Sequence, residues 1–272
     1  MDWMLEGSHG QVVVQEWPNE QASWLAVLAH GYGEHIGRYA HVAAALQAAG
    51  AAVVGPDHEG HGRSAGQRAV ITDFEDVVDD LHQVAQRTAA RYAGLPQVLI
   101  GHSMGGLIAA RYAQRYGSEL GALVLSGPMF GARDLVMQLL SLETIPDVPL
   151  DPSVLSRDTS VGTAYAADPL VWHGPFQRPM LQAMASALDA TAAGPSLGDL
   201  PTLWVHGEAD QLVPLAATRS LMEHLRGTHF EEHFFAEAQH EVFNEINSDE
   251  VLHVVIDFVH RALASAQERE RR

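Results

Sequence analysis

The 272-residue sequence contains no cysteine, so disulfide bonds and thiolate metal sites are excluded. It also has no apolar run close to the roughly 18 residues that a membrane-spanning helix needs. Its first residues, Met1 to Glu6, lack the basic start and the apolar stretch of a signal peptide. From these absences we expect a cytoplasmic protein without stable membrane insertion.

Positive charge is scarce, since 16 basic residues face 34 acidic ones and the formal net charge is −18. A surface of this sign repels phosphate backbones, so we expect no nucleic-acid partner. The closing residues 268–272 are locally basic, but short charged tails are usually solvated, and we assign this tail no function. With 47% hydrophobic and 18% charged residues, the composition is that of an ordinary globular protein.

Short β-rich segments alternate along the chain with segments of helical period. The β-rich segments are residues 12–16, 24–29, 51–55, 97–101, 122–126, 202–206 and 230–235. The clearest helical stripe runs from Phe74 to Thr88, with acidic residues in its first turn and arginines near its end, as the helix dipole favours. This alternation predicts an α/β fold whose mostly parallel central sheet is covered by helices on both faces.

The alternation stops between residues 127 and 194, where prolines interrupt short apolar helical pieces. We interpret residues 127–194 as an inserted helical cap, and residues 1–126 and 195–272 as the core. The inserted segment is rich in Met, Leu, Phe and Trp. These side chains either line a substrate pocket or pack the cap against the sheet.

A candidate nucleophile stands where a strand passes directly into a helix. Gly101-His102-Ser103-Met104-Gly105 follows the strand expected at residues 97–101. At such a sharp turn the serine hydroxyl projects above the sheet, and flanking glycines let strand and helix approach closely. The position predicts the nucleophile elbow of an α/β-hydrolase, with Ser103 as the attacking group.

A serine hydroxyl needs a base, and in this fold the acid and then the histidine follow the serine along the chain. His240 fits as the base, because it lies after the last expected strand and before the last helix. The acid should follow the preceding strand, where Asp210 ends the turn Gly207-Glu208-Ala209. We favour Asp210 over three competitors, which are Glu208, Asp199 and Glu237.

Acyl transfer also needs two backbone N–H donors for the oxyanion of the tetrahedral intermediate. Met104 supplies the first, because it follows the nucleophile. The glycines of His30-Gly31-Tyr32-Gly33 allow the backbone to turn its amides inward, so we expect the second from Tyr32. The alternative is that His30-Gly31 is only a tight turn.

Other histidines lie outside this constellation. Asp57-His58-Glu59-Gly60-His61 looks superficially like a metal site, but it lacks the helical His-Glu-x-x-His spacing and its glycines oppose a helix. We therefore expect no metal here. His102 and His206 lie on or beside buried strands and are interpreted as structural histidines.

Together these motifs resemble the monoacylglycerol lipase and lysophospholipase branch of the α/β-hydrolase superfamily. The stretches that carry the resemblance follow the family's order over nearly the whole chain and are His30-Gly31-Tyr32-Gly33-Glu34-His35 with Gly37-Arg38-Tyr39, Asp57-His58-Glu59-Gly60-His61-Gly62-Arg63-Ser64, Gly101-His102-Ser103-Met104-Gly105-Gly106, Asp168-Pro169-Leu170, His206-Gly207-Glu208-Ala209-Asp210 and His240-Glu241-Val242-Phe243-Asn244-Glu245. The cap matches least, apart from Asp168-Pro169-Leu170.

The resemblance implies an α/β-hydrolase fold with a mobile helical cap over an apolar tunnel, a glycerol-sized polar pocket near the triad, and no cofactor. It also implies hydrolysis of monoacylglycerols or similar monoacyl esters through an acyl-enzyme on Ser103, with transient contact between the cap and a lipid surface. Three alternatives remain open: a lysophospholipase, a carboxylesterase for small or aryl esters, and an inactive ligand-binding protein of the same fold.

Overall fold

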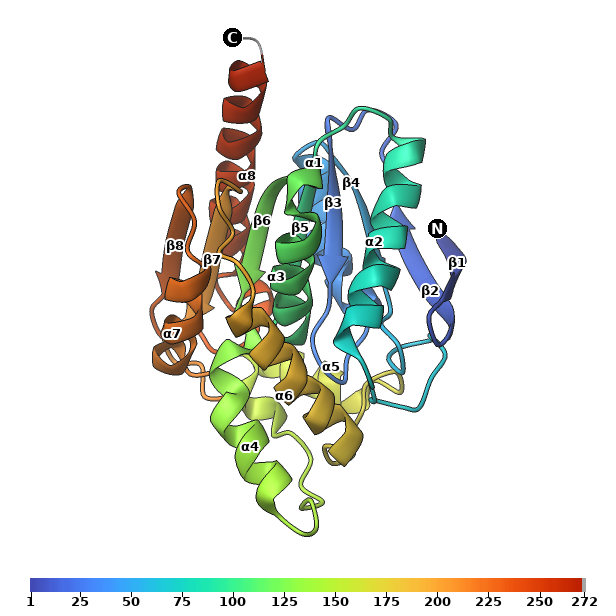
Figure 1. Ribbon diagram of the computed structural model, residues 1–272, viewed down its shortest axis with the longest axis vertical. Coiled ribbons are helices and arrows are strands. Elements are labelled where there is room, and N and C mark those ends of the chain that lie inside the picture. The colour runs from blue at the N-terminus through green and yellow to red at the C-terminus, as the bar shows by residue number, and fades with distance from the viewer. Residues whose placement is uncertain (271–272) are drawn as a thin grey trace.

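The centre of the computed structural model, which describes residues 1–270, is one eight-stranded sheet (Figure 1). The strands are β1 (Asp2–Gly7), β2 (Gly10–Trp17), β3 (Trp24–Ala29), β4 (Ala51–Pro56), β5 (Gln97–His102), β6 (Leu120–Ser126), β7 (Thr202–Gly207) and β8 (Phe230–Phe235). Strands β2 to β8 confirm the seven β-rich segments expected from the sequence. Several of them are buried along their whole length, which explains their continuous apolar runs.

The sheet order β1-β2-β4-β3-β5-β6-β7-β8 confirms a mostly parallel sheet. Strands β3 to β8 pair in parallel, whereas β1 and β2 form an antiparallel edge, of which the sequence pattern predicts only β2. Strand β1 escaped detection because its exposure alternates along only six residues. In the middle of the sheet, Ala29 pairs with Gly101, so the loops that follow β3 and β5 emerge side by side.

Helices cover both faces of the sheet. Helices α1 (Ala40–Ala48) and α8 (Ser248–Glu270) pack on one face, and α2 (Phe74–Arg91), α3 (Met104–Tyr116) and α7 (Leu215–Leu225) pack on the other (Figure 1). The expected stripe from Phe74 to Thr88 is the buried side of α2. Asp73 caps this helix by accepting the N–H of Glu75 at 2.9 Å.

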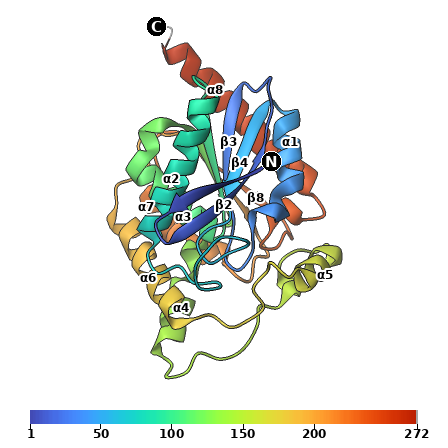
Figure 2. The same ribbon diagram turned by 90° about the vertical axis from the view of Figure 1, so that its right-hand side faces the viewer.

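Between β6 and β7 the chain, which is described throughout, forms helices and turns but no strand. Its main helices are α4 (Arg133–Ser141), α5 (Thr159–Ala167) and α6 (Arg178–Ala193). Figure 2 shows α4 and α6 together below one face of the sheet and α5 below the other, joined by extended chain. The division into a core and a cap at residues 127–194 stays a prediction, and "the cap" denotes those residues below.

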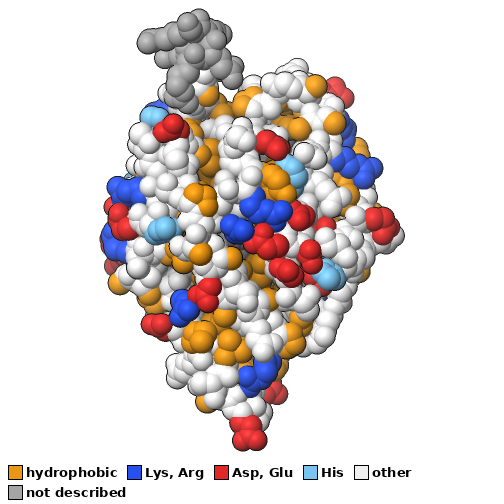
Figure 3. All heavy atoms as spheres, viewed as in Figure 1, with side chains coloured by type: hydrophobic (Ala, Val, Ile, Leu, Met, Phe, Trp, Pro, Cys, Tyr) orange, Lys and Arg blue, Asp and Glu red, His pale blue; other side chains and the backbone are white. Residues whose placement is uncertain are grey.

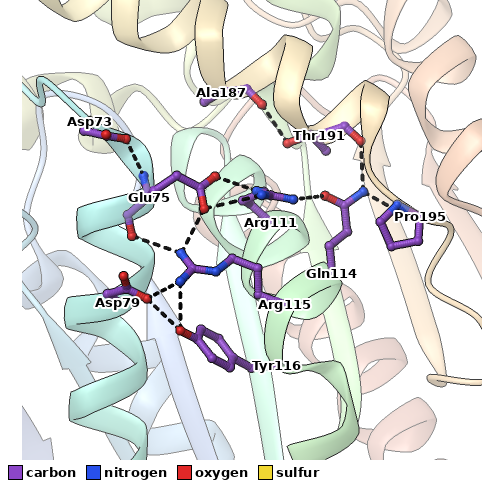
Figure 4. A network of polar contacts seen from close by, with 10 residues as sticks. All are labelled: Asp73, Glu75, Asp79, Arg111, Gln114, Arg115, Tyr116, Ala187, Thr191 and Pro195. Atoms are coloured by element: carbon purple, nitrogen blue, oxygen red, sulfur yellow. Dashed lines mark hydrogen bonds and ion pairs between the residues drawn. The ribbon is translucent and has the colours of Figure 1, made fainter.

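Two polar side chains hold α6 and its neighbours through main-chain carbonyls. Gln114 on α3 donates its side-chain N–H groups to the carbonyl oxygens of Thr191 and Pro195, each at 2.9 Å (Figure 4). Arg178, the first residue of α6, donates to the carbonyl oxygen of Leu140 at 2.9 Å. The end of the cap is thus fixed to the core, and the last turn of α4 is fixed to α6.

Helix α3 is itself tied to α2 by a network of charged groups (Figure 4). Arg111 and Arg115 both donate to the Glu75 carboxylate, and Arg115 also contacts Asp79 at 2.5 Å. Figure 3 shows acidic and basic side chains mixed across the middle of this face of the molecule. Single exposed ion pairs contribute little to stability, but a shared network fixes the spacing of the two helices.

No helix within residues 1–270 combines the length and the apolar character needed to cross a membrane. The charged tail noted in the sequence reaches the end of α8, and its residues 271–272 lie outside the described chain.

Candidate active site

Ser103 occupies a strained turn between β5 and α3. Its φ of +54° lies in the left-handed region that L-residues rarely adopt. The turn is tight because a Cβ added at Gly105 would overlap the carbonyl oxygen of Ala29, and one at Gly101 would overlap that of Gly105. The two glycines are therefore required where strand and helix meet, and the elbow geometry that the sequence predicts is present.

The structure brings the three predicted triad residues into one chain of contacts. Nε2 of His240 lies 2.9 Å from Oγ of Ser103, and Nδ1 of His240 lies 2.7 Å from Oδ2 of Asp210. An ionised carboxylate can only accept, so Nδ1 carries the proton that is donated to Asp210. Nε2 is then free to accept the proton of the Ser103 hydroxyl, which is the arrangement a general base requires.

The acid is held by more contacts than the sequence suggested. Oδ1 of Asp210 accepts the N–H groups of Leu212 and Val213, both at 2.9 Å. Nε2 of His206 lies 3.1 Å from Oδ2 of Asp210, and the indole N–H of Trp204 donates to Nδ1 of His206 at 3.1 Å. His206 is therefore a structural histidine, as expected, but one that touches the candidate acid.

The three competing acids lie away from this chain of contacts. Glu208, Asp199 and Glu237 are all exposed. Asp199 instead accepts the hydroxyl of Thr228, and Glu237 lies 3.5 Å from Arg157. Among the four candidates, Asp210 is the one that contacts His240.

Burial and charge oppose each other in setting the pKa values of this site. Burial lowers the pKa of His240, but the Asp210 carboxylate, with Glu241 and Glu34, raises it above its ordinary value. Burial raises the pKa of Asp210, but His240 and His206 hold it below its ordinary value. Burial, reinforced by His240, lowers the pKa of His102 to about 4. His102 thus stays neutral beside the base, whose ring centroid is 4.8 Å away.

The two predicted oxyanion donors lie on either side of Ser103. Met104 is the first residue of α3, where a helix leaves its amide without a partner. Tyr32 follows Gly31, where an added Cβ would lie 3.3 Å from Cβ of Ser103, so this loop passes beside the serine. Neither amide meets a hydrogen-bond acceptor among residues 1–270. Both are free to donate to an oxygen bound beside Ser103.

A buried ion-pair cluster beside the triad was not identified from the sequence. The guanidinium of Arg38 donates to both carboxylate oxygens of Glu241, at 2.8 and 2.7 Å, and also to Glu34. Burial raises the pKa of Glu34, but Arg38 outweighs it and lowers that pKa to about 2. The four-residue spacing of Glu34 and Arg38 was a local signal for part of this cluster. Glu241, 203 residues from Arg38, gave none.

A cavity with about 1030 Å³ of empty space, including its mouth, opens above Ser103. Its apolar wall comes mainly from the cap and includes Val136, Leu139, Leu155, Trp172, Phe176 and Met184. Glu34, Glu241 and His102 form a polar end. Of the apolar cap residues, some line this cavity, and others, such as Phe130 and Met180, are buried in the core cluster instead.

The segment Asp57-His58-Glu59-Gly60-His61 supports the loop that carries Tyr32. The Asp57 carboxylate accepts the N–H of Ile36 at 2.8 Å, and the N–H of His58 donates to Nε2 of His30 at 3.0 Å. Within the described residues, no three His, Asp or Glu side chains are placed to hold a metal ion. The segment is thus part of the support beneath the candidate oxyanion donors.

Comparison with known proteins places the chain in a family. The profile of the family described as serine aminopeptidase, S33 matches residues 20–247. The chain belongs to this family. A monoacylglycerol lipase of Mycolicibacterium smegmatis is 36% identical, with 92% of each chain covered, and a monoglyceride lipase of Rattus norvegicus is 31% identical over 93% of this chain and 87% of its own.

Solved structures agree with the S33 assignment. The crystal structure of the Paleococcus ferrophilus monoacylglycerol lipase matches with a TM-score of 0.79 and 25% identity, covering 92% of this chain and 99% of that one. A soluble variant of the monoglyceride lipase of Saccharomyces cerevisiae gives a TM-score of 0.82 at 17% identity. The chain therefore has the α/β-hydrolase fold, and the resemblance seen in its motifs is confirmed.

Proposed function

We propose that this protein hydrolyses monoacylglycerols or similar monoacyl esters as a serine hydrolase. The observation that carries the proposal is the contact chain from Ser103 through His240 to Asp210 at the base of an apolar cavity. Membership of the S33 family and the similarity to monoacylglycerol lipases support it.

The reaction follows from the positions of these groups. Oγ of Ser103 attacks the ester carbonyl while Nε2 of His240 takes its proton, and Asp210 stabilises the imidazolium that forms. The amides of Tyr32 and Met104 donate to the oxyanion. When the intermediate collapses, the C–O bond breaks and the imidazolium returns its proton to the departing alcohol. Water, deprotonated by His240, then attacks the acyl-enzyme. The bond between Oγ of Ser103 and the acyl group breaks, the imidazolium returns its proton to Oγ, and the fatty acid is released.

The cavity supports a single acyl chain bound to a small uncharged alcohol. We propose that residues 127–194 form a lid whose apolar inner side holds the chain. At the polar end, Glu34 and Glu241 face one guanidinium, that of Arg38, so the cluster carries one net negative charge. Such an end disfavours a phosphate-bearing head group. This favours a monoacylglycerol over a lysophospholipid.

We further propose that the protein acts in the cytoplasm and that its cap touches lipid surfaces transiently. Leu135, Met137, Leu142 and Val148 are exposed apolar residues of the cap. Figure 3 shows hydrophobic side chains gathered on the lower part of the molecule, where α4 and α6 lie. Co-sedimentation with phosphatidylcholine vesicles tests the contact, and replacing Val148 and Met137 by serine should weaken it.

The experiment for the substrate is a comparison of kcat/KM for monoacylglycerol, lysophosphatidylcholine and short p-nitrophenyl esters. We expect monoacylglycerol to be preferred and triacylglycerol to be poor, because a closed lid leaves no room for further chains. A preference for lysophosphatidylcholine would indicate a lysophospholipase. If kcat/KM stays constant or falls as the acyl chain of the ester becomes longer, the protein is a general carboxylesterase.

The assignment of the triad is tested separately. Ser103→Ala and His240→Ala should lower kcat by about 10⁶, and Asp210→Ala by less. A fluorophosphonate should label the wild-type serine and leave folded Ser103→Ala unlabelled. Absence of labelling in the wild type would favour the inactive ligand-binding protein, and a folded Ser103→Ala variant with most of its activity would refute the nucleophile.

A further inference from the structure

The candidate oxyanion loop and the loop that carries His240 are joined by one side chain. Arg38 donates to both oxygens of Glu241, the residue directly after His240. The same guanidinium donates to Glu34, whose other oxygen accepts the N–H of Gly31 at 2.6 Å. Gly31 directly precedes Tyr32. The two groups that must meet at a substrate carbonyl therefore share a single charged connection, here called the clasp, made of Glu34, Arg38 and Glu241.

The clasp is buried, and several hydrogen bonds hold its side chains in place. Glu34 and Glu241 are each 4% exposed, and the Arg38 side chain is 11% exposed. Glu34 also accepts the hydroxyl of Tyr39 at 2.7 Å, and Glu241 accepts the side-chain N–H of Asn244 at 2.8 Å. A planar guanidinium that binds a carboxylate with two parallel bonds fixes both position and orientation. A cluster of this kind leaves the two loops little freedom relative to each other.

The cap closes over the clasp. The ring of Tyr165 on α5 lies 5.0 Å from Cζ of Arg38, and the carbonyl oxygen of Leu155 accepts the N–H of Glu241 at 2.8 Å. The N–H of Trp172 donates to the carbonyl oxygen of Gly33 at 2.7 Å, next to Tyr32. A seated cap thus excludes water from the ion pairs, which strengthens them because charges interact more strongly in a low-dielectric environment.

We propose that Arg38 and Glu241 are positioning residues, which hold the amide of Tyr32 and the imidazole of His240 at the spacing that acyl transfer requires. The proposal rests on the hydrolase function above. Misplacement of a reacting group by about 1 Å can cost about 10²-fold in rate. Loosening the clasp should therefore lower kcat while leaving the apolar binding of the acyl chain, and hence KM, nearly unchanged.

The decisive variant is Glu241→Gln, which keeps the shape of the side chain and leaves the Glu34–Arg38 pair intact. We expect kcat to fall by about 10- to 100-fold with KM changed less than about threefold. Arg38→Lys should act in the same direction, because an ammonium cannot reproduce the two parallel bonds. The double variant should be no worse than the more impaired single variant, because both changes break one unit.

Two substrates separate positioning from direct contact with the alcohol. Glu241 lines the polar end of the cavity, so it could act by touching the head group. A positioning role predicts equal loss of kcat for monoacylglycerol and for p-nitrophenyl acetate. A loss confined to monoacylglycerol, or a rise in KM alone, would overturn the proposal.

A matched pair on the surface provides the control. Arg261 on α8 and Glu231 on β8 form an ion pair at 2.7 Å, with both side chains more than half exposed. Arg261→Lys and Glu231→Gln should leave kcat unchanged. Titration with a fluorophosphonate counts the active serines in every sample. If Glu241→Gln lowers only the fraction of active protein, the clasp is merely structural and the proposal fails; if the wild type does not label, the hydrolase function itself fails.

Discussion

Lowering the pH should destabilise the protein through histidines that are buried without charge. His61 is 1% exposed, its Nδ1 lies 2.7 Å from the carbonyl oxygen of Glu59, and its Nε2 has no partner within the described residues. Burial, reinforced by His30, lowers the pKa of His61 to about 3. Burial and the neighbouring His240 lower the pKa of His102 to about 4. Between these lowered pKa values and the ordinary pKa of histidine, both side chains are protonated in the unfolded chain but remain neutral in the folded protein.

The size of the effect follows from these values. The unfolded chain binds protons near a pKa of about 6.5, so stability is complete above that pH and falls as the pH drops toward the folded pKa. At about pH 5, each of the two histidines should cost about 2 kcal/mol relative to about pH 8. Together they remove about 4 kcal/mol, a large part of the 5–15 kcal/mol typical of a folded domain. The raised pKa of His240 acts in the opposite direction, because protonation of that ring favours the folded state.

Unfolding in urea at about pH 8 and about pH 5 measures this change, and His61→Asn isolates one contribution. The asparagine amide can still donate to the carbonyl oxygen of Glu59, but it does not titrate. The difference in unfolding free energy between the two pH values should shrink by about 2 kcal/mol in the variant. His229 is exposed, and His229→Gln should leave the difference unchanged. An equal pH dependence in wild type and His61→Asn would refute the reasoning.

Three further predictions concern activity. Tyr32→Ala should keep much of the activity, whereas Tyr32→Pro removes the N–H and should lower kcat by about 10²–10³; equal small effects would place the donor elsewhere. His240 must be neutral to act as a base, and its pKa is raised. As the pH is lowered, kcat/KM should therefore fall with a midpoint above the ordinary pKa of histidine. A midpoint below that pKa would contradict the prediction. Met184→Trp should fill part of the cavity, so kcat/KM for long acyl esters should fall while that for short esters persists; uniform loss would indicate overpacking of the core instead.

Elements with a dense local pattern could be predicted from the sequence. The apolar stripe of α2 and the fully buried strands can be recognised because the spacing of apolar residues along each segment shows which of them are buried. Strand β1 was missed because its alternating, half-exposed pattern at Asp2–Gly7 resembles ordinary surface chain. The arrangement of α4, α5 and α6 was equally out of reach, since it depends on which apolar faces meet.

The candidate site divides in the same way. The sequence predicts that Ser103, Asp210 and His240 meet, because each follows a strand end in an order that the fold dictates, and the structure brings the three side chains into contact. The clasp could not be predicted, because the contact between Arg38 and Glu241 joins residues 203 positions apart. Each of these residues alone looks like an ordinary surface charge. The contact of His206 with Asp210 was missed for a similar reason, since a histidine on a buried strand gives no sign of its partner.

The way the cap is held bears on how its sequence can diverge. Gln114 and Arg178 bind main-chain carbonyls of Thr191, Pro195 and Leu140, and every amino acid provides such a carbonyl. Mutations in the gripped segments therefore leave the attachment intact, provided that the backbone keeps its path. Residues that line the cavity can therefore be substituted during evolution without loss of the contacts that hold the cap. Grafting residues 133–150 from a relative would exploit the same tolerance, because Arg178 of the host would still find a main-chain carbonyl at position 140 of the new segment.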